Sequence, residues 1–147
     1  MNIGLVGDSN HSLDSKGRLI IPARFRQNLG ASFVLCRGMD RTIYAYPADE
    51  WEKFSDKLNT LPIADPNARN FKRHFQGSAN VVETDSQCRI VIPLNLRKFA
   101  EIDKDVVLIG QGDKVEIWSK ERYDASCDFD SDNFDEIAFN VNEKYGV

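Results

Sequence analysis

The stretch Leu13-Asp-Ser-Lys-Gly-Arg-Leu-Ile-Ile-Pro22 occurs twice in this chain in closely similar form. The second copy, 71 residues further on, reads Thr84-Asp-Ser-Gln-Cys-Arg-Ile-Val-Ile-Pro93. Arg26 and Arg97 keep the same offset, so the match extends beyond the quoted stretch. A repeat of this kind predicts that one small structural unit is supplied twice by the same chain.

The repeat continues downstream with a one-residue shift. Ile43-Tyr-Ala-Tyr46 followed by Trp51 matches Val115-Glu-Ile-Trp118 followed by Tyr123 at an offset of 72. We therefore expect the following organisation: a first unit at 1–60, a linker helix at 61–77, a second unit at 78–123 and a tail at 124–147.

Each unit has the pattern of a strand, a polar turn, a short apolar strand, a short helix, a hairpin and a second helix. Proline favours the start of a helix, and one follows each apolar strand, at Pro22 and Pro93. Residues spaced i, i+4 on these helices are apolar and are expected to face a core: Phe25 with Leu29, and Leu96 with Ala100.

Hairpin signals follow the short helices in both units. Glycine-containing turns separate Ser32–Cys36 from Thr42–Tyr46, and Asp105–Ile109 from Lys114–Trp118. The polar turn of the repeated stretch is expected at the mouth of a further hairpin. The fold class predicted is α+β, mainly β, with short helices.

Two more helices are predicted outside the units. Asp65-Pro66 is a suitable cap and first turn for a helix that runs to about Gln76. In the tail, apolar residues recur at helical spacing behind the capping candidates Ser131 and Asp132. They are Phe134, Ile137, Ala138, Val141 and Tyr145. This acidic amphipathic helix needs a surface to cover.

The net charge of −4 is unevenly distributed along the 147 residues. Residues 1–123 hold 18 bases and 16 acids, whereas residues 124–147 hold one base and seven acids. The net charge is thus +2 for the body of the chain, residues 1–123, and −6 for the tail, residues 124–147. A mildly basic body is compatible with nucleic acid if its bases gather on one face.

Composition argues against several other functions. The three cysteines have no CxxC spacing and the two histidines lie far from any pair of them, so we expect no metal and no cofactor. We expect no membrane span, because no apolar run approaches the required length. No catalytic motif is present, so we expect neither enzyme activity nor a small-molecule substrate. The cysteines suit a reducing cytoplasm.

The repeated turn carries residues suited to nucleic acid. Asp14 and Asp85 are turn formers, and Gly17 can supply a positive φ. Arg18 and Arg89 leave the turns with planar five-donor groups that match phosphates and guanine edges. Further candidate DNA-binding bases lie nearby: Lys16, Arg24, Arg26 and Arg97.

A structural interpretation of the same residues stays open. Each aspartate can simply pair with the arginine four residues later and hold the turn shut. The neighbouring bases can likewise form a solvated helix face. Repetition of the arginine-bearing turn favours the binding interpretation.

Two Asp-x-x-x-Arg turns, each before an apolar strand and proline, resemble the MraZ family over essentially the whole chain. The resemblance implies an AbrB/MazE-like split β-barrel supplied twice. It further implies binding of double-stranded DNA by the turns, and a ring-like homo-oligomer on the nucleoid. Such regulators act at short direct repeats upstream of the division and cell-wall gene cluster, including their own operon.

One position departs from the family pattern. Cys88 stands where the first turn has Gly17, so a left-handed backbone there would cost about 1–2 kcal/mol. We therefore expect the second turn to be shaped differently and to contribute less to DNA binding. The rival function is a protein-interaction module of the antitoxin type, whose acidic tail helix clasps a basic partner.

Overall fold

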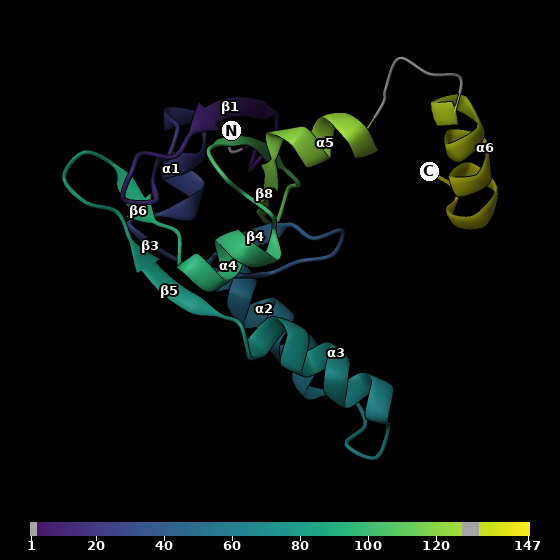
Figure 1. The fold of residues 1–147 in the computed structure, drawn as a ribbon. Helices are drawn as coiled ribbons and strands as arrows, with labels where there is room; N and C mark the ends of the chain where they lie inside the picture. The colour runs from purple at the N-terminus through teal and green to yellow at the C-terminus, as the bar shows by residue number, and fades with distance from the viewer. Residues whose placement is uncertain (1–2, 128–132) are drawn as a thin grey trace.

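The computed structural model describes residues 3–127 and 133–147. Its fold is mixed α+β, mainly sheet with short helices, as predicted (Figure 1). In chain order the elements are β1 (Asp8–Ser12), β2 (Arg18–Ile20), α1 (Ala23–Leu29), β3 (Ser32–Arg37), β4 (Ile43–Pro47), α2 (Ala48–Asn59), α3 (Pro66–Gln76), β5 (Asn80–Glu83), β6 (Arg89–Val91), α4 (Leu94–Phe99), β7 (Asp105–Gly110), β8 (Val115–Ser119), α5 (Lys120–Ser126) and α6 (Asn133–Tyr145).

One six-stranded sheet contains strands of both repeats, with the hairpin of each repeat flanked by strands of the other or by its hairpin. Its order is β1-β7-β8-β4-β3-β5, with every neighbouring pair antiparallel. β1 of the first repeat pairs with β7 of the second, and β5 of the second pairs with β3 of the first. Both repeats are therefore needed to build this one sheet.

The remaining two strands, β2 and β6, pair only with each other and form what we call the β2–β6 ribbon. The predicted hairpins β3–β4 and β7–β8 are confirmed. The hairpin expected at each polar turn is wrong, because the strands that flank a turn pair with different partners: β1 with β7, and β2 with β6. Local sequence favours the strands but does not choose between near and distant partners.

The main core lies between one face of the sheet and the ribbon. Phe33 and Leu35, two residues apart on β3, point to this face. Leu19 and Ile90 oppose each other at the centre of the ribbon, and both are buried in the same cluster. The residues predicted to face the core are buried here too: Phe25 and Leu29 of α1, Leu96 of α4, and Ala100, which caps the end of α4.

The other face of the sheet packs on α2 and α3 through aromatic rings. Tyr44 and Tyr46 of β4 share a buried cluster with Phe75 of α3. Asp65 caps α3 as predicted, since its carboxylate accepts hydrogen bonds from the backbone of Asn67 and Ala68.

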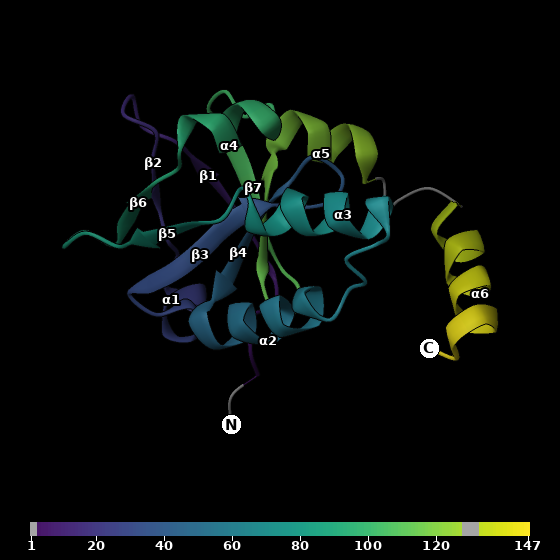
Figure 2. The ribbon, with the colours of Figure 1, turned by 90° about the horizontal axis from the view of Figure 1, so that it is seen from below.

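Figures 1 and 2 show the α2–α3 connection on the side of the molecule opposite the turn between β5 and β6.

The predicted tail helix forms as α6, and none of its residues is buried. Its apolar side chains are exposed, including Phe134, Ile137 and Val141. The capping candidates Ser131 and Asp132 lie outside the described residues. Among the described residues, no helix is long and apolar enough to cross a lipid bilayer.

Candidate nucleic-acid interface

The aspartate of the first turn organises the turn around its own carboxylate. Oδ1 of Asp14 accepts backbone hydrogen bonds from Lys16 and Arg18, both at 2.9 Å. Oδ2 of Asp14 accepts a third from Nε of Arg18 at 2.6 Å. These side-chain bonds close the turn together with a backbone bond, in which the N–H of Asp14 donates to the carbonyl of Arg18 at 3.1 Å.

The second turn repeats these bonds one for one. Oδ1 of Asp85 accepts from the backbone of Gln87 and Arg89 at 2.9 Å, and Oδ2 accepts from Nε of Arg89 at 2.8 Å. In both turns the backbone N–H of the arginine does most to lower the pKa of the aspartate below its ordinary value. Both carboxylates are thus held in the charged form that binds arginine.

The backbone of both turns is left-handed at the equivalent position. Gly17 has φ of 74° and Cys88 has φ of 60°. Each residue donates its N–H to the carbonyl of the aspartate three residues earlier, at 3.0 Å. The expectation that Cys88 gives the second turn a different shape is wrong, because the bonds to Asp85 impose the same backbone despite the side chain.

We expect Cys88→Gly and Gly17→Ala to change the free energy of unfolding in opposite directions. Cys88→Gly relieves left-handed strain of about 1–2 kcal/mol and adds the entropy cost of glycine, for a net stabilisation of about 1 kcal/mol. Gly17→Ala introduces that strain and also crowds Arg97, because an added Cβ would lie 2.8 Å from its Cζ. Denaturant unfolding of both variants measures this. Equal destabilisation by the two changes would contradict the account.

The ribbon connects the two turns and sets their arginines on one face. The carbonyl of Cys88 accepts from the backbone N–H of Ile21 at 2.8 Å, and that of Gly17 accepts from Ile92 at 3.0 Å. Arg18 lies opposite Val91, and Ile20 lies opposite Arg89. Directly opposed residues share a face of a sheet, as do residues two apart. Both arginines therefore lie on the outer face of the ribbon, away from Leu19 and Ile90.

The two helix arginines are held by equivalent bonds, and one of them lies beside the turn of the other repeat. Nε of Arg97 donates to the carbonyl of Ile92 at 3.0 Å, and the guanidinium lies against Gly17 of the first turn. Nε of Arg26 makes the equivalent bond to the carbonyl of Ile21 at 2.7 Å, and the backbone N–H of Ile21 donates to Cys88 of the second turn. The structure thus places Arg97 beside the turn that carries Arg18.

The other two predicted bases are placed differently. Lys16 is exposed on the first turn, where the second turn has Gln87. Arg24 points away from the turns, because its Nη1 donates to the carbonyl of Asp8 at the start of β1, at 2.8 Å. The structure therefore brings Lys16, Arg18 and Arg97 to the first turn and leaves Arg24 at the flank.

The ion pairs within the turns leave part of each guanidinium group available for a ligand. The side-chain hydrogen bonds of Arg18 and Arg89 within the described chain run through Nε, so their Nη groups are left to face a ligand. Holding the turn and binding a ligand are therefore compatible. Both turns lie on the same side of the molecule in the two views (Figures 1 and 2).

Two exposed apolar residues complete the outer face and were not singled out from the sequence. Ile20 is 51% exposed and Val91 is 54% exposed. Each of them lies within a run of three consecutive apolar residues, so the sequence does not indicate which side chain of the run points outward. The one available signal is that the same repeat position is β-branched in both copies.

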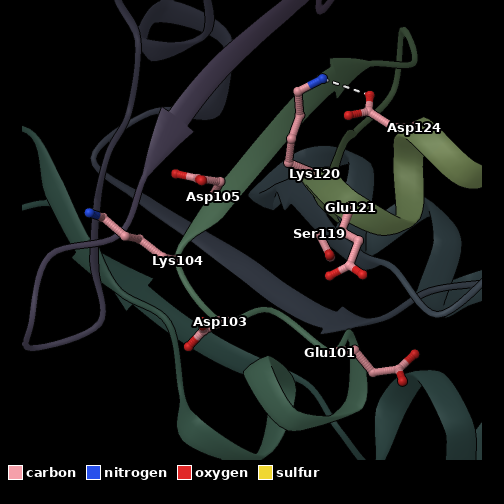
Figure 3. A pocket seen from close by; sticks show the side chains of 8 residues that line it. All are labelled: Glu101, Asp103, Lys104, Asp105, Ser119, Lys120, Glu121 and Asp124. Atoms are coloured by element: carbon pink, nitrogen blue, oxygen red, sulfur yellow. Dashed lines mark hydrogen bonds and ion pairs between the residues drawn. The ribbon is translucent and has the colours of Figure 1, made fainter.

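A surface cleft elsewhere has the wrong charge for nucleic acid. It has a volume of about 410 Å³ and is lined by Glu101, Asp103, Lys104, Asp105, Ser119, Lys120, Glu121 and Asp124. Figure 3 shows Lys120 directed at Asp124, with which it forms an ion pair of 2.6 Å. None of the predicted site residues lines this cleft. In the described part of the chain, no group of three or more His, Cys, Asp or Glu residues could hold a metal ion.

A family model described as "MraZ protein, putative antitoxin-like" matches the chain twice, over residues 5–74 and 75–140. This chain belongs to the MraZ family. Curated relatives support the assignment along nearly the whole length. The chain is 47% identical to a protein of Halothermothrix orenii over 133 residues, which cover 90% of this chain and 93% of the relative.

Two further relatives of the MraZ family are comparably similar. A Clostridium tetani protein is 44% identical over 138 residues, covering 94% of this chain and 96% of the relative. A Caldanaerobacter subterraneus protein is 47% identical over 134 residues, covering 91% and 94%. All three relatives carry the name Transcriptional regulator MraZ.

Proposed function

We propose that this chain is a sequence-specific DNA-binding transcriptional regulator and not an enzyme. The observation that carries the proposal is the outer face of the β2–β6 ribbon, where Arg18 and Arg89 are presented by identically bonded turns. A two-stranded ribbon fits the major groove of B-form DNA, and arginine binds the O6 and N7 acceptors of guanine. The names of the relatives support a regulator.

The predicted residues take distinct roles in this proposal. Arg18 and Arg89 read guanine edges, whereas Lys16, Arg26 and Arg97 hold phosphates around them. Arg24 adds a phosphate contact at the flank. Asp14, Gly17 and Asp85 shape the turns. No cofactor takes part.

The proposed target is a set of short direct repeats upstream of the division and cell-wall gene cluster, including the operon of the protein itself. One chain presents few base-reading groups, and linking several modest sites raises apparent affinity by about 10²–10⁴. We propose a head-to-tail ring on the cytoplasmic nucleoid. Subunits related by rotation favour half-sites in one orientation, spaced about 10 base pairs apart.

The test measures the mass of the oligomer and the dependence of DNA affinity on the number of repeats and on salt concentration. Light scattering should give a monodisperse oligomer, and affinity should rise from one to two to three repeats. Binding should weaken by about 0.9 log units per phosphate contact for each tenfold rise in salt. A monodisperse monomer would refute the ring. Affinity independent of salt would refute DNA binding by this basic face.

A second candidate function rests on α6, whose apolar residues are exposed alongside acidic ones. Such a helix suits an antitoxin-type module that clasps a basic partner. Removing residues 124–147 separates the possibilities. Aggregation would indicate that the helix covers the body, and tighter DNA binding would indicate that its charge opposes DNA. A soluble fragment with unchanged DNA affinity would leave the helix free for such a partner.

A further inference from the structure

We propose that Ile20 and Val91 are specificity-determining residues that contact the C5-methyl groups of thymines in the major groove. The inference rests on the proposed DNA-binding function and adds to it a second kind of base contact. It assigns a role to two side chains that the arginine-based account leaves unused.

The position of the two side chains carries the inference. Ile20 lies directly opposite Arg89, and Val91 lies directly opposite Arg18. Opposed residues in an antiparallel pair have Cβ atoms about 4.5–5.5 Å apart. The outer face of the ribbon is therefore a square of four side chains, with the arginines on one diagonal and the β-branched residues on the other.

The fold does not require apolar side chains at these two exposed positions. The ribbon packs on the core through Leu19 and Ile90, which are 0% and 1% exposed. Ile20 and Val91 point the opposite way and are about half exposed. A polar residue at these positions would leave the core unchanged, yet both repeats place a β-branched apolar residue there.

The chemistry of the face selects duplex DNA as its occupant. The arginine Nη groups supply donors and positive charge, and the turn carboxylates are already engaged by Arg18 and Arg89. The major groove offers matching groups, because guanine presents two acceptors and thymine presents an acceptor and an apolar methyl. Branched aliphatic side chains have no hydrogen bond to offer, so the methyl group is their complement. We therefore expect thymines next to the guanines read by the arginines.

The experiment removes the methyl groups from the DNA and not only the side chains from the protein. The full-length protein first selects duplexes from a random double-stranded pool. Each thymine of the selected site is then replaced singly by uracil, which lacks only the methyl. Equilibrium titrations at fixed salt should show affinity reduced about fourfold at the contacted thymines, the value for one buried methyl group.

The variants link each effect to its side chain. Ile20→Ala should abolish the thymine-over-uracil preference at one set of positions, and Val91→Ala should abolish it at another. Ile63→Ala is the matched control, because Ile63 is 85% exposed and lies in the α2–α3 connection away from the ribbon. It should keep every preference. Thermal melts confirm that each variant remains folded.

The outcomes separate this inference from the function on which it rests. If the wild-type protein selects no duplex, the proposed function fails. If it selects duplexes but binds the uracil forms equally well, or if the two alanine variants keep the preference, the inference alone is overturned. The same holds if the variants change the oligomer mass and leave the preference intact, because the apolar pair would then contact a second copy of the chain.

Discussion

Replacing Arg18 with alanine is expected to weaken binding to the specific site by about 5- to 150-fold, the range for a bidentate base contact worth about 1–3 kcal/mol. Arg89→Ala is expected to lose a similar amount, because the second turn reproduces every bond of the first. Gel-shift titration of each variant on specific and non-specific duplexes measures the loss.

The fold should survive both changes. Without the arginine side chain, Asp14 still accepts two backbone hydrogen bonds that define the turn. Arg24→Ala is the matched control, since Arg24 is held at the start of β1 and not on the ribbon. It should weaken specific and non-specific binding alike. Unchanged affinity in Arg18→Ala, with the melting temperature preserved, would contradict the assignment of the base-reading residue.

Truncating the neighbouring residue, Leu19, should lower stability and leave DNA binding intact. Leu19→Ala is expected to lower the free energy of unfolding by about 2–5 kcal/mol, because it empties a fully buried position at the centre of the main core. That is a large fraction of the roughly 5–15 kcal/mol that stabilises a domain. The outer face is untouched, so DNA affinity should persist wherever the variant is folded.

Denaturant unfolding tests this second expectation, with Ile20→Ala as the control one residue along the strand. Ile20 is half exposed, so its truncation should cost at most about 1 kcal/mol. If Leu19→Ala proved no more destabilising than Ile20→Ala, the ribbon would not pack on the core through the face described here.

The sequence predicts the local elements of this fold well. Pro22 and Pro93 immediately precede α1 and α4, and the i, i+4 pairs of those helices are buried. The glycine-containing turns correctly join β3 to β4 and β7 to β8. These features depend on residues close in the chain, where side-chain periodicity and backbone preference act directly.

The partners of the shorter strands could not be predicted in the same way. β2 and β6 have three residues each and lie in different repeats, so no local pattern indicates that they pair. Their pairing is decided by burying Leu19 against Ile90 over the sheet, a contact between distant segments. For the same reason no local pattern indicates that Arg97 lies against the turn that contains Gly17.

Of the candidate site, the turn arginines were predictable because the repeat presents them twice. Cys88 does not change the shape of the second turn, because the bonds to Asp85 outweigh the backbone preference of this one residue. Ile20 and Val91 were hidden within apolar runs, where alternation between faces leaves no trace in the sequence.

Footprinting on the DNA immediately upstream of the gene for this protein tests whether the two turns read a specific site. We expect protection of short repeats in one orientation, spaced by about one helical turn, and loss of that protection in the combined Arg18→Ala and Arg89→Ala variant. Sequence-specific protection that persists unchanged in the folded double variant would contradict it, as would retention of DNA without any preferred site.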